Sequence, residues 1–250
     1  MSAPSHASKQ LPATIDRELT DLLGPPRSPW EAPGFSYADE LLGWASRWSS
    51  PERIRQLVQA VCEDPALLSA CAARSFHHPL GFDKFVLLVA DRYEVRLHVW
   101  WPGTRALHEH IHDHRFAFAS CTLAGTVRST VYEESPHGVL MARYRESRTE
   151  RARDYVFHEP ELTRVVALPP RPHPSGTGYF LRPDVLHRVW PTTDTGTATL
   201  VVKVPTPRAT TTVLMDPLGK PPARIRRRFL DTETTRARLL RAAKWCAREV

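Results

Sequence analysis

Histidines occupy every second position of residues 107–115, which read LHEHIHDHR. Alternate residues of an extended strand point to the same side, so His108, His110, His112 and His114 would all face one way. Neutral imidazole nitrogens are common ligands of transition metals. The segment therefore predicts a metal site, and a polar cavity or a solvated loop are the other possibilities.

A metal site needs a further ligand from elsewhere in the chain, and the best candidate is His187, which follows a Pro-Asp turn in FLRPDVLHRVWP. Closure of a β-sandwich can bring such a turn over the strand that carries His112 and His114. Three histidines would hold a metal on one face and leave its other positions open. His110 shares the parity of His112 and His114, so a shift in register would make it the alternative ligand.

Two periodicities divide the chain. Helical patterns occur in ATIDRELTDLL, in SYADELLGWASRW and in a segment that starts with Ser50 and a following proline, as helices prefer, and that Pro65 interrupts. From about residue 84 the period changes to two, and eight or so short strands follow before a last helical segment, TTRARLLRAAKWCARE. This order predicts a mainly β sandwich or barrel with N-terminal helices and a C-terminal helix.

One strand shows the alternation clearly. In YEVRLHVWW, three apolar residues alternate with Arg96, His98 and Trp100, which is typical of a strand with one buried face. Asp113 and Arg115 point away from the histidines by the same parity, and we expect them to form salt bridges. His77 and His78 precede the first strand and are expected to lie in a loop.

The length of 250 residues suits one large β domain with helical additions. The sequence divides into four parts, which are a disordered N-terminus (1–10), an N-terminal helical segment (11–78), a barrel (79–222) and a basic helical tail (223–250). With 42% hydrophobic and 24% charged residues, the composition excludes a wholly disordered or fibrous chain. The chain is therefore expected to form one globular core with a helical accessory.

Composition also limits the partners and the location. The four cysteines form no CxxC pair, which excludes a disulfide framework and a thiolate zinc site. No apolar run approaches the roughly 18 residues of a membrane span, so we expect a cytoplasmic protein. The net charge is +7, but the basic run ARIRRRF (223–229) lacks interleaved aromatic residues. It predicts a solvated tail and not a nucleic-acid site.

The order of these motifs resembles the cupin superfamily. A His-x-His, Gly125 about a dozen residues later, and a proline-containing turn that ends in a histidine are similar to the two cupin motifs. Within the superfamily, WWPGTRALHEHIHDH, LAGTVRSTVYEE, VLHRVWP and TATLVVKVPTPR resemble the thiol dioxygenases of the cysteine dioxygenase type. The resemblance covers roughly residues 74–210, and its most specific part is the combination of IHDH with LHRV.

The resemblance implies a cupin-type double-stranded β-helix, a jelly-roll barrel, with a mononuclear Fe(II) site of His112, His114 and His187. It implies an oxygenase that binds dioxygen and a small anionic or amino-acid-like substrate at the metal. Thiol dioxygenases place a carboxylate-binding arginine near the entry to the barrel, and Arg74 is the candidate for that part.

Four residues near the expected ligands are further candidates for substrate binding. Tyr179 and Arg182 precede the third ligand, and either would orient a substrate, Tyr179 through its hydroxyl and Arg182 through a bidentate grip on a carboxylate. Phe116 and Phe118 share the parity of the metal ligands and would form an apolar wall. Surface exposure is the competing interpretation for Tyr179 and Arg182, and ordinary core packing for the two phenylalanines.

The sequence also departs from this family. Phe118 and Ala119 stand where most metal cupins carry a carboxylate ligand, and Phe118 also takes the place of the cysteine that the animal enzymes cross-link to tyrosine. The His-x-Tyr on the strand after the third ligand corresponds here to Val201 and Lys203. A neutral ligand set leaves the metal its full charge to attract an anion. We therefore expect a retained metal and a changed substrate.

Two other functions stay open. Three histidines also suit zinc or nickel, which would support lyase, isomerase or hydrolase chemistry. A metal-free cupin that binds a small molecule is the other possibility. No glycine-rich phosphate loop, nucleophile elbow or HExxH motif is present in the sequence. The protein would be a monomer or a homodimer.

Overall fold

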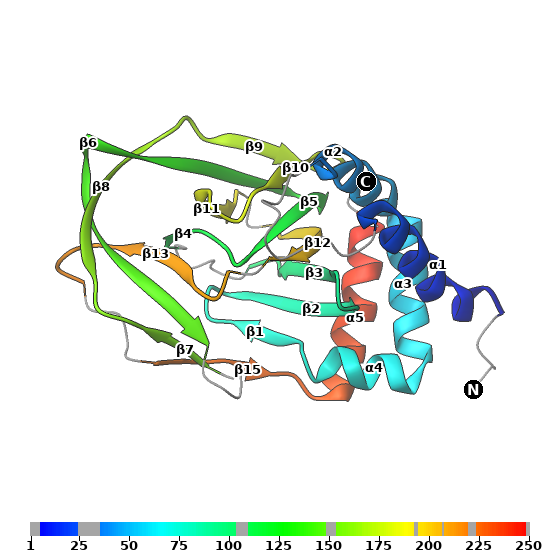
Figure 1. Ribbon diagram of the computed structural model, residues 1–250. Coiled ribbons are helices and arrows are strands. Elements are labelled where there is room, and N and C mark those ends of the chain that lie inside the picture. The colour runs from blue at the N-terminus through cyan, green and yellow to red at the C-terminus, as the bar shows by residue number, and fades with distance from the viewer. Residues whose placement is uncertain are drawn as a thin grey trace.

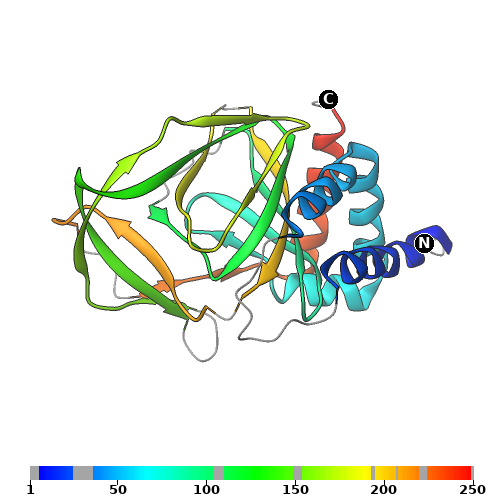
Figure 2. The same cartoon turned by 45° about the horizontal axis from the view of Figure 1, so that its top comes forward.

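The computed structural model describes residues 6–24, 36–103, 110–148, 154–192, 195–206, 208–219 and 224–248. Its helices are α1 (His6–Leu23), α2 (Ala38–Trp48), α3 (Pro51–Glu63), α4 (Pro65–Ala72) and α5 (Thr232–Cys246). They gather on one side of a two-sheet barrel in both views of Figures 1 and 2. None of the described helices has the length and apolar character needed to cross a membrane.

Two antiparallel sheets form the barrel (Figure 1). Sheet A contains, in spatial order, β10 (Gly178–Leu181), β5 (Phe116–Ala124), β12 (Thr197–Pro205), β3 (Glu94–Trp100), β2 (Phe82–Val89), β1 (Phe76–His78) and β15 (Arg228–Phe229). Sheet B contains β11 (Leu186–Pro191), β4 (Ile111–His112), β13 (Thr211–Met215), β6 (Thr126–Arg148), β7 (Asp154–Phe157) and β14 (Arg224–Arg226), with β8 (Glu161–Ala167) and β9 (Arg171–Pro174) paired to β6.

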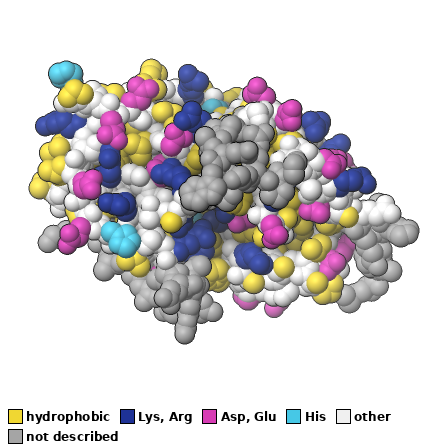
Figure 3. Space-filling model, in the orientation of Figure 1, with side chains coloured by type: hydrophobic (Ala, Val, Ile, Leu, Met, Phe, Trp, Pro, Cys, Tyr) yellow, Lys and Arg dark blue, Asp and Glu magenta, His cyan; other side chains and the backbone are white. Residues whose placement is uncertain are grey.

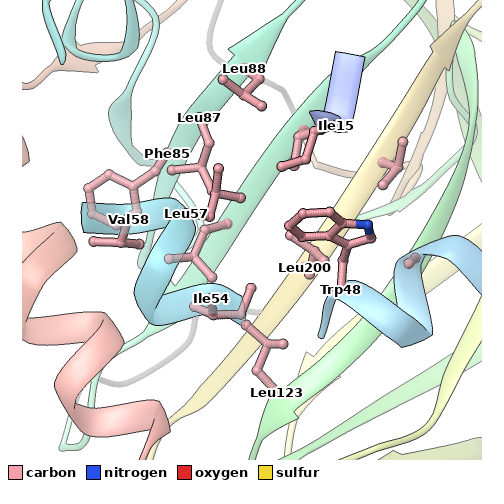
Figure 4. Packing of buried hydrophobic residues seen from close by; sticks show 14 of the residues in the cluster. Ile15, Trp48, Ile54, Leu57, Val58, Phe85, Leu87, Leu88, Leu123 and Leu200 are labelled. Carbon is pink, nitrogen blue, oxygen red and sulfur yellow. The ribbon is translucent and has the colours of Figure 1, made fainter. Parts of the chain in front are cut away.

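The main hydrophobic core lies between the helices and the outer face of sheet A. Figure 4 shows side chains from α1, α2 and α3 packed against side chains from β2, β5 and β12, among them Trp48, Ile54, Leu57, Phe85, Leu123 and Leu200. The strands of sheet A therefore bury one set of alternate residues under the helices. The other set faces the interior of the barrel.

The C-terminal helix is tied to sheet A through one carboxylate. Asp83 of β2 is fully buried and accepts hydrogen bonds from Arg238 of α5 (2.8 and 2.9 Å) and from the indole nitrogen of Trp101 (2.7 Å). The Nδ1 atom of His77 lies 2.9 Å from the same carboxylate. Helices from both ends of the chain thus cover one sheet face, since α3 also packs against α5.

The predicted fold class is confirmed, because the protein is mainly β, has helices before the barrel and ends in a helix. The Ser50 side chain accepts a hydrogen bond from the backbone of Arg53 at the start of α3, as its N-cap pattern predicts. Pro65 begins a separate helix, so the predicted break is also present. All four cysteines are free and buried.

Several predicted boundaries differ from the structure. Helix α1 begins at His6, so residues 6–10, expected to be disordered, are helical. The basic run 223–229, expected to be a solvated tail, forms β14 and β15 over its described part because the edges of β7 and β1 pair with it. Basic and acidic side chains are interspersed on the face shown in Figure 3.

Two other local predictions are corrected. His77 and His78, expected in a loop, belong to β1, which pairs with β2. The expected strands TVRSTVYEE and LMARYRES are one strand, β6, which continues through an irregularity between Glu134 and Val139 in its pairing with β8.

Gly125, the glycine of the first cupin-like motif, closes the turn between β5 and β6. Its φ is +71°, and a Cβ there would lie 2.4 Å from the carbonyl oxygen of Gly196. Gly176 has a φ of +82° but has nothing within 4 Å of such a Cβ. A side chain at either glycine would therefore strain the backbone, but only a side chain at Gly125 would also clash with a neighbouring atom.

We expect Gly125→Ala to destabilise the protein more than Gly176→Ala. Both substitutions carry the left-handed strain of about 1–2 kcal/mol, and Gly125→Ala adds about 1–3 kcal/mol because the new methyl group overpacks the turn. Urea unfolding of both variants measures the difference. Equal losses of unfolding free energy in the two variants would show that the backbone around Gly196 moves to accommodate the new methyl group without destabilising the protein.

Candidate metal centre

The three predicted ligands come together in the barrel. His112 ends β4, His187 lies opposite it in the register of β11, and His114 follows His112 by two residues. The backbone N–H of His114 donates to the carbonyl of Pro183 (3.0 Å), which fixes the segment after β4 against the turn before β11. One ring nitrogen from each histidine lies within 4.8 Å of the others.

The donor set fits one small transition-metal ion. His114 Nε2 and His187 Nε2 are 2.8 Å apart, and the three ring centroids are separated by 4.7–4.9 Å. Nitrogens bound at about 2.1 Å to one ion lie about 3–3.4 Å from each other. His187 is buried, and its Nδ1 has no hydrogen-bond partner among the described residues. At this distance one Nε2–H can donate to the other Nε2, and a bound ion would take the place of that proton.

Protonation and tautomer both favour metal binding. Burial lowers the pKa of His114 and of His187 well below the usual value, with His112 the next cause in both, so the imidazoles are neutral as ligands must be. His112 Nδ1 lies 2.9 Å from the carbonyl oxygen of His110. Donation to that carbonyl places the lone pair of the neutral His112 ring on Nε2.

The alternative ligand, His110, stays outside the cluster of ligand atoms. Its side chain lines the cavity next to the three histidines, while its carbonyl orients His112. Burial, followed by the nearby Arg188, lowers the pKa of His110. His108 lies outside the described residues.

Phe116, Phe118 and Tyr179 line the cavity beside the histidines, where the sequence places them. The Phe116 ring stacks on His114 at 4.7 Å, and Phe118 meets His114 edge-on at 5.1 Å. Phe118 also contacts Tyr179, with 5.8 Å between ring centroids. An apolar ring therefore occupies the position at which the resemblance to metal cupins would have placed a carboxylate ligand.

Two candidate substrate-binding residues lie outside the cavity. Arg74 is exposed after α4, and its guanidinium donates to the carbonyl of Ala70 (3.2 Å). Arg182 is exposed and pairs with Asp184 at 2.6 Å. Arg74 was proposed from the family resemblance and Arg182 from its position before the third ligand, but both side chains are directed to solvent.

The cavity between the sheets has a volume of about 220 Å³. Lys84, Arg96 and Lys203, which we call the cationic cluster, come from β2, β3 and β12 and are each at most 8% exposed. The Nζ of Lys203 lies 4.8 Å, and the guanidinium carbon of Arg96 5.1 Å, from the centroid of the Phe116 ring. The cationic cluster is thus only one aromatic ring away from His114.

One carboxylate, that of Glu94, forms ion pairs with two members of the cationic cluster. Glu94 accepts hydrogen bonds from Lys203 (2.7 Å) and from two nitrogens of Arg96. Burial alone would raise the pKa of Glu94, but Arg96 and Lys203 outweigh it and lower the pKa to about 2. Burial, followed by Arg96, lowers the pKa of Lys203 to about 8. The cluster is therefore held together by a single buried anion.

Acid should weaken the fold through Glu94. Its pKa is lower in the folded state than in the unfolded chain, so its contribution is complete above about pH 4.5 and is lost as the pH falls toward 2. We expect the protein to lose about 2–3 kcal/mol over this range through Glu94. Urea unfolding at several pH values measures this loss.

Glu94→Gln should remove that pH dependence, whereas Glu134→Gln should keep it, because Glu134 pairs with Arg143 while 60% exposed. A steep loss that persists between pH 4.5 and 2 in Glu94→Gln would contradict this assignment.

Asp113 and Arg115 differ from each other in their surroundings. Asp113 faces away from the cavity as predicted, is buried, and accepts hydrogen bonds from Arg208 (2.7 Å) and from the backbone of Thr212 (2.6 Å). Arg115 instead lines the cavity, 4.0 Å from Glu146. Burial raises the pKa of Glu146, which is the acidic residue among the described side chains that line the cavity.

The sequence analysis missed several cavity residues, namely His78, Lys84, Arg96, His98 and Glu146. Arg96 and His98 were identified as the polar set of an alternating strand and placed on its solvent face. Arg96 and His98 face the cavity because the alternate apolar residues of the same strand pack under the helices. The sequence did contain a signal for this placement. The predicted helices are numerous enough to cover the apolar face of the sheet, which leaves the polar face to line the interior of the barrel.

Comparisons with known proteins give only distant likenesses. No family model and no curated protein matches the chain. Among solved structures, TT1209 from Thermus thermophilus is 17% identical with a TM-score of 0.30, covering 52% of this chain and 90% of its own. The DMSP lyase DddQ from Ruegeria pomeroyi DSS-3 is 17% identical with a TM-score of 0.33, covering 56% of this chain and 54% of its own.

An oxalate decarboxylase is 12% identical with a TM-score of 0.32, and the match covers 55% of this chain and 30% of that protein. The chain therefore matches about half of the lyase and about a third of the decarboxylase. Likenesses this low do not assign an activity.

Proposed function

We propose that the protein is a mononuclear metal-dependent enzyme of the cupin type, an Fe(II) oxygenase that acts on a small anionic substrate. The observation that carries this proposal is the convergence of His112, His114 and His187 nitrogens on a cavity that Lys84 and Arg96 also line. A metal with three neutral ligands and buried cations beside it both attract an anion.

The three histidines would hold the ion, which when bound supplies an electrophilic centre and the electrons for dioxygen chemistry. Phe116 and Phe118 exclude a fourth protein ligand and keep water from one side of the site. The cationic cluster orients the anionic part of the substrate. Glu146 can exchange a proton with the substrate at its carboxylate oxygen, since burial keeps its pKa raised.

A zinc or nickel enzyme of the lyase, isomerase or hydrolase type is the second candidate. The neutral three-histidine set supports it as well, since zinc sites of this kind bind a water in the open position. A metal-free cupin that binds a small molecule is the third.

The test starts from metal content. Protein purified without chelators or immobilised metal is analysed for iron, zinc and nickel, and is then loaded with Fe(II) or Zn(II) under argon. Oxygen uptake and product formation are measured over a panel of thiols, amino acids and other small organic acids. Substrate-dependent oxygen uptake with Fe(II) alone supports the oxygenase. Turnover of a substrate without oxygen uptake identifies the lyase or hydrolase, and protein that binds no metal contradicts both.

A further inference from the structure

The sheet A wall of the cavity carries polar groups that the proposed metal site does not use. Lys84 of β2 and His98 of β3 are direct partners in the antiparallel register, and Arg96 precedes His98 by two residues on the same face of the strand. All three side chains line the cavity. They therefore lie side by side, facing the interior of the barrel.

None of the three has its hydrogen-bonding capacity filled by the described residues. Lys84 has no carboxylate in ion-pair distance among them, and its Nζ lies 4.7 Å from the Phe76 ring centroid. His98 Nε2 is buried without a hydrogen-bond partner. Arg96 uses Nε and one amino nitrogen for Glu94, which leaves the other amino nitrogen available.

The charges of this wall do not balance. Lys84, Arg96 and Lys203 are basic, and Glu94 is the one carboxylate that pairs with any of them in the described structure. When all three are protonated, two positive charges have no counter-charge among the described residues, and buried uncompensated charges are unfavourable. In agreement, burial, followed by the nearby Arg96, lowers the pKa of Lys84 well below its usual value. A ligand with two negative charges would balance the cluster.

We infer that Lys84, Arg96 and His98 form a binding site for a doubly charged oxyanion, such as the phosphate monoester or phosphonate group of the substrate. A tetrahedral oxyanion offers three oxygens to an ammonium, a guanidinium and an imidazole N–H, each at a different angle. A single carboxylate would leave one charge of the cluster uncompensated.

The inference deepens the proposed function, because the same cavity would hold both the oxyanion and the metal. The Phe116 ring contacts both sites, since its centroid lies 5.1 Å from the guanidinium carbon of Arg96 and 4.7 Å from the His114 ring. A small substrate could therefore bind the metal with one group and this site with the other. The oxyanion site itself requires no metal.

Inorganic phosphate is the probe for a calorimetric titration at constant ionic strength, with methylphosphonate, malonate and acetate as comparisons. The titrations use the full chain and its His187→Ala variant, in which the metal site is incomplete. Phosphate and methylphosphonate should bind in both proteins, and acetate should bind at least about tenfold more weakly. Binding lost in His187→Ala would show that phosphate binds the metal and would overturn the inference, as would acetate or malonate binding as tightly as phosphate.

Lys84→Met should weaken phosphate binding by about ten- to a hundredfold, the loss of one charge-assisted hydrogen bond. Lys84→Arg should stay within about tenfold of the natural protein, which keeps the test valid if the methionine variant folds poorly. Arg145→Met is the matched control, because Arg145 is 69% exposed and pairs with Glu161. Unchanged phosphate affinity in a folded Lys84→Met would overturn the inference.

The melting temperature gives a readout that a purely structural lysine would not produce. In anion-free buffer, Lys84→Met should melt at a higher temperature than the natural protein, because it removes an uncompensated buried charge. At one phosphate concentration, the melting temperature should rise more in the natural protein than in the variant, which binds phosphate more weakly. A lower melting temperature of the variant in anion-free buffer would contradict the proposed charge imbalance.

Discussion

Replacing His187 with alanine is expected to abolish stoichiometric metal binding and, with it, the catalytic activity. His187 supplies one of three convergent nitrogens, and among the described residues no carboxylate belongs to this group of candidate ligands. Mutation of groups that merely orient a ligand already weakens metal binding about 10–100-fold, so loss of a ligand should exceed about a hundredfold. Metal analysis after gel filtration measures the effect.

His137→Ala is the matched control, because His137 is an exposed histidine on β6. This variant should keep the metal content and the activity of the natural protein. Circular dichroism of His187→Ala checks that its barrel is still folded. Full metal occupancy in a folded His187→Ala would contradict the three-histidine site and return His110 to consideration as a ligand.

Asp83→Ala should be the most destabilising single substitution that we predict outside the metal centre. The carboxylate is fully buried and accepts hydrogen bonds from Arg238 and Trp101, so its loss leaves a guanidinium and an indole N–H without their acceptor. Breaking a buried ion pair by removing one partner costs about 3–5 kcal/mol. Urea unfolding followed by tryptophan fluorescence and circular dichroism measures the loss.

Asp184→Ala provides the comparison, since Asp184 forms an ion pair with Arg182 in which both side chains are more than half exposed. Such surface pairs contribute about 0–1 kcal/mol. A loss in Asp83→Ala no larger than in Asp184→Ala would mean that α5 is held to sheet A by its apolar contacts alone.

The convergence of the three histidines could be predicted from the sequence because their spacing is local. His112 and His114 are separated by one residue, and a strand places such residues on one face. His187 needed only a turn and a nearby strand. Arg182 was proposed from its position before His187 and Arg74 from the family resemblance, but position along the chain does not determine where a long side chain points.

The cationic cluster could not be predicted, because it depends on which strands are neighbours. Lys84, Arg96 and Lys203 are brought together by the pairing of β2 with β3 and of β3 with β12. Alternation within one strand shows that two faces differ, but it does not show which face meets solvent. Here the apolar face meets helices and the polar face meets the cavity, so both are covered.

The length of β6 could also not be predicted from the local sequence. Its middle contains SPHG, residues that are typical of a turn, and the sequence therefore predicted two strands. In the structure, pairing with β8 continues on both sides of an irregularity and keeps the backbone extended. Tertiary hydrogen bonds thus outweigh the local preference for a turn.

The position of α5 has a consequence for biosynthesis. This helix follows every strand in the chain, yet it covers the same sheet face as α3, which precedes every strand. During synthesis from the N-terminus, the apolar face of sheet A stays partly open until residues 232–246 have left the ribosome. We therefore expect the nascent chain to be most prone to aggregate late in its synthesis, before α5 docks.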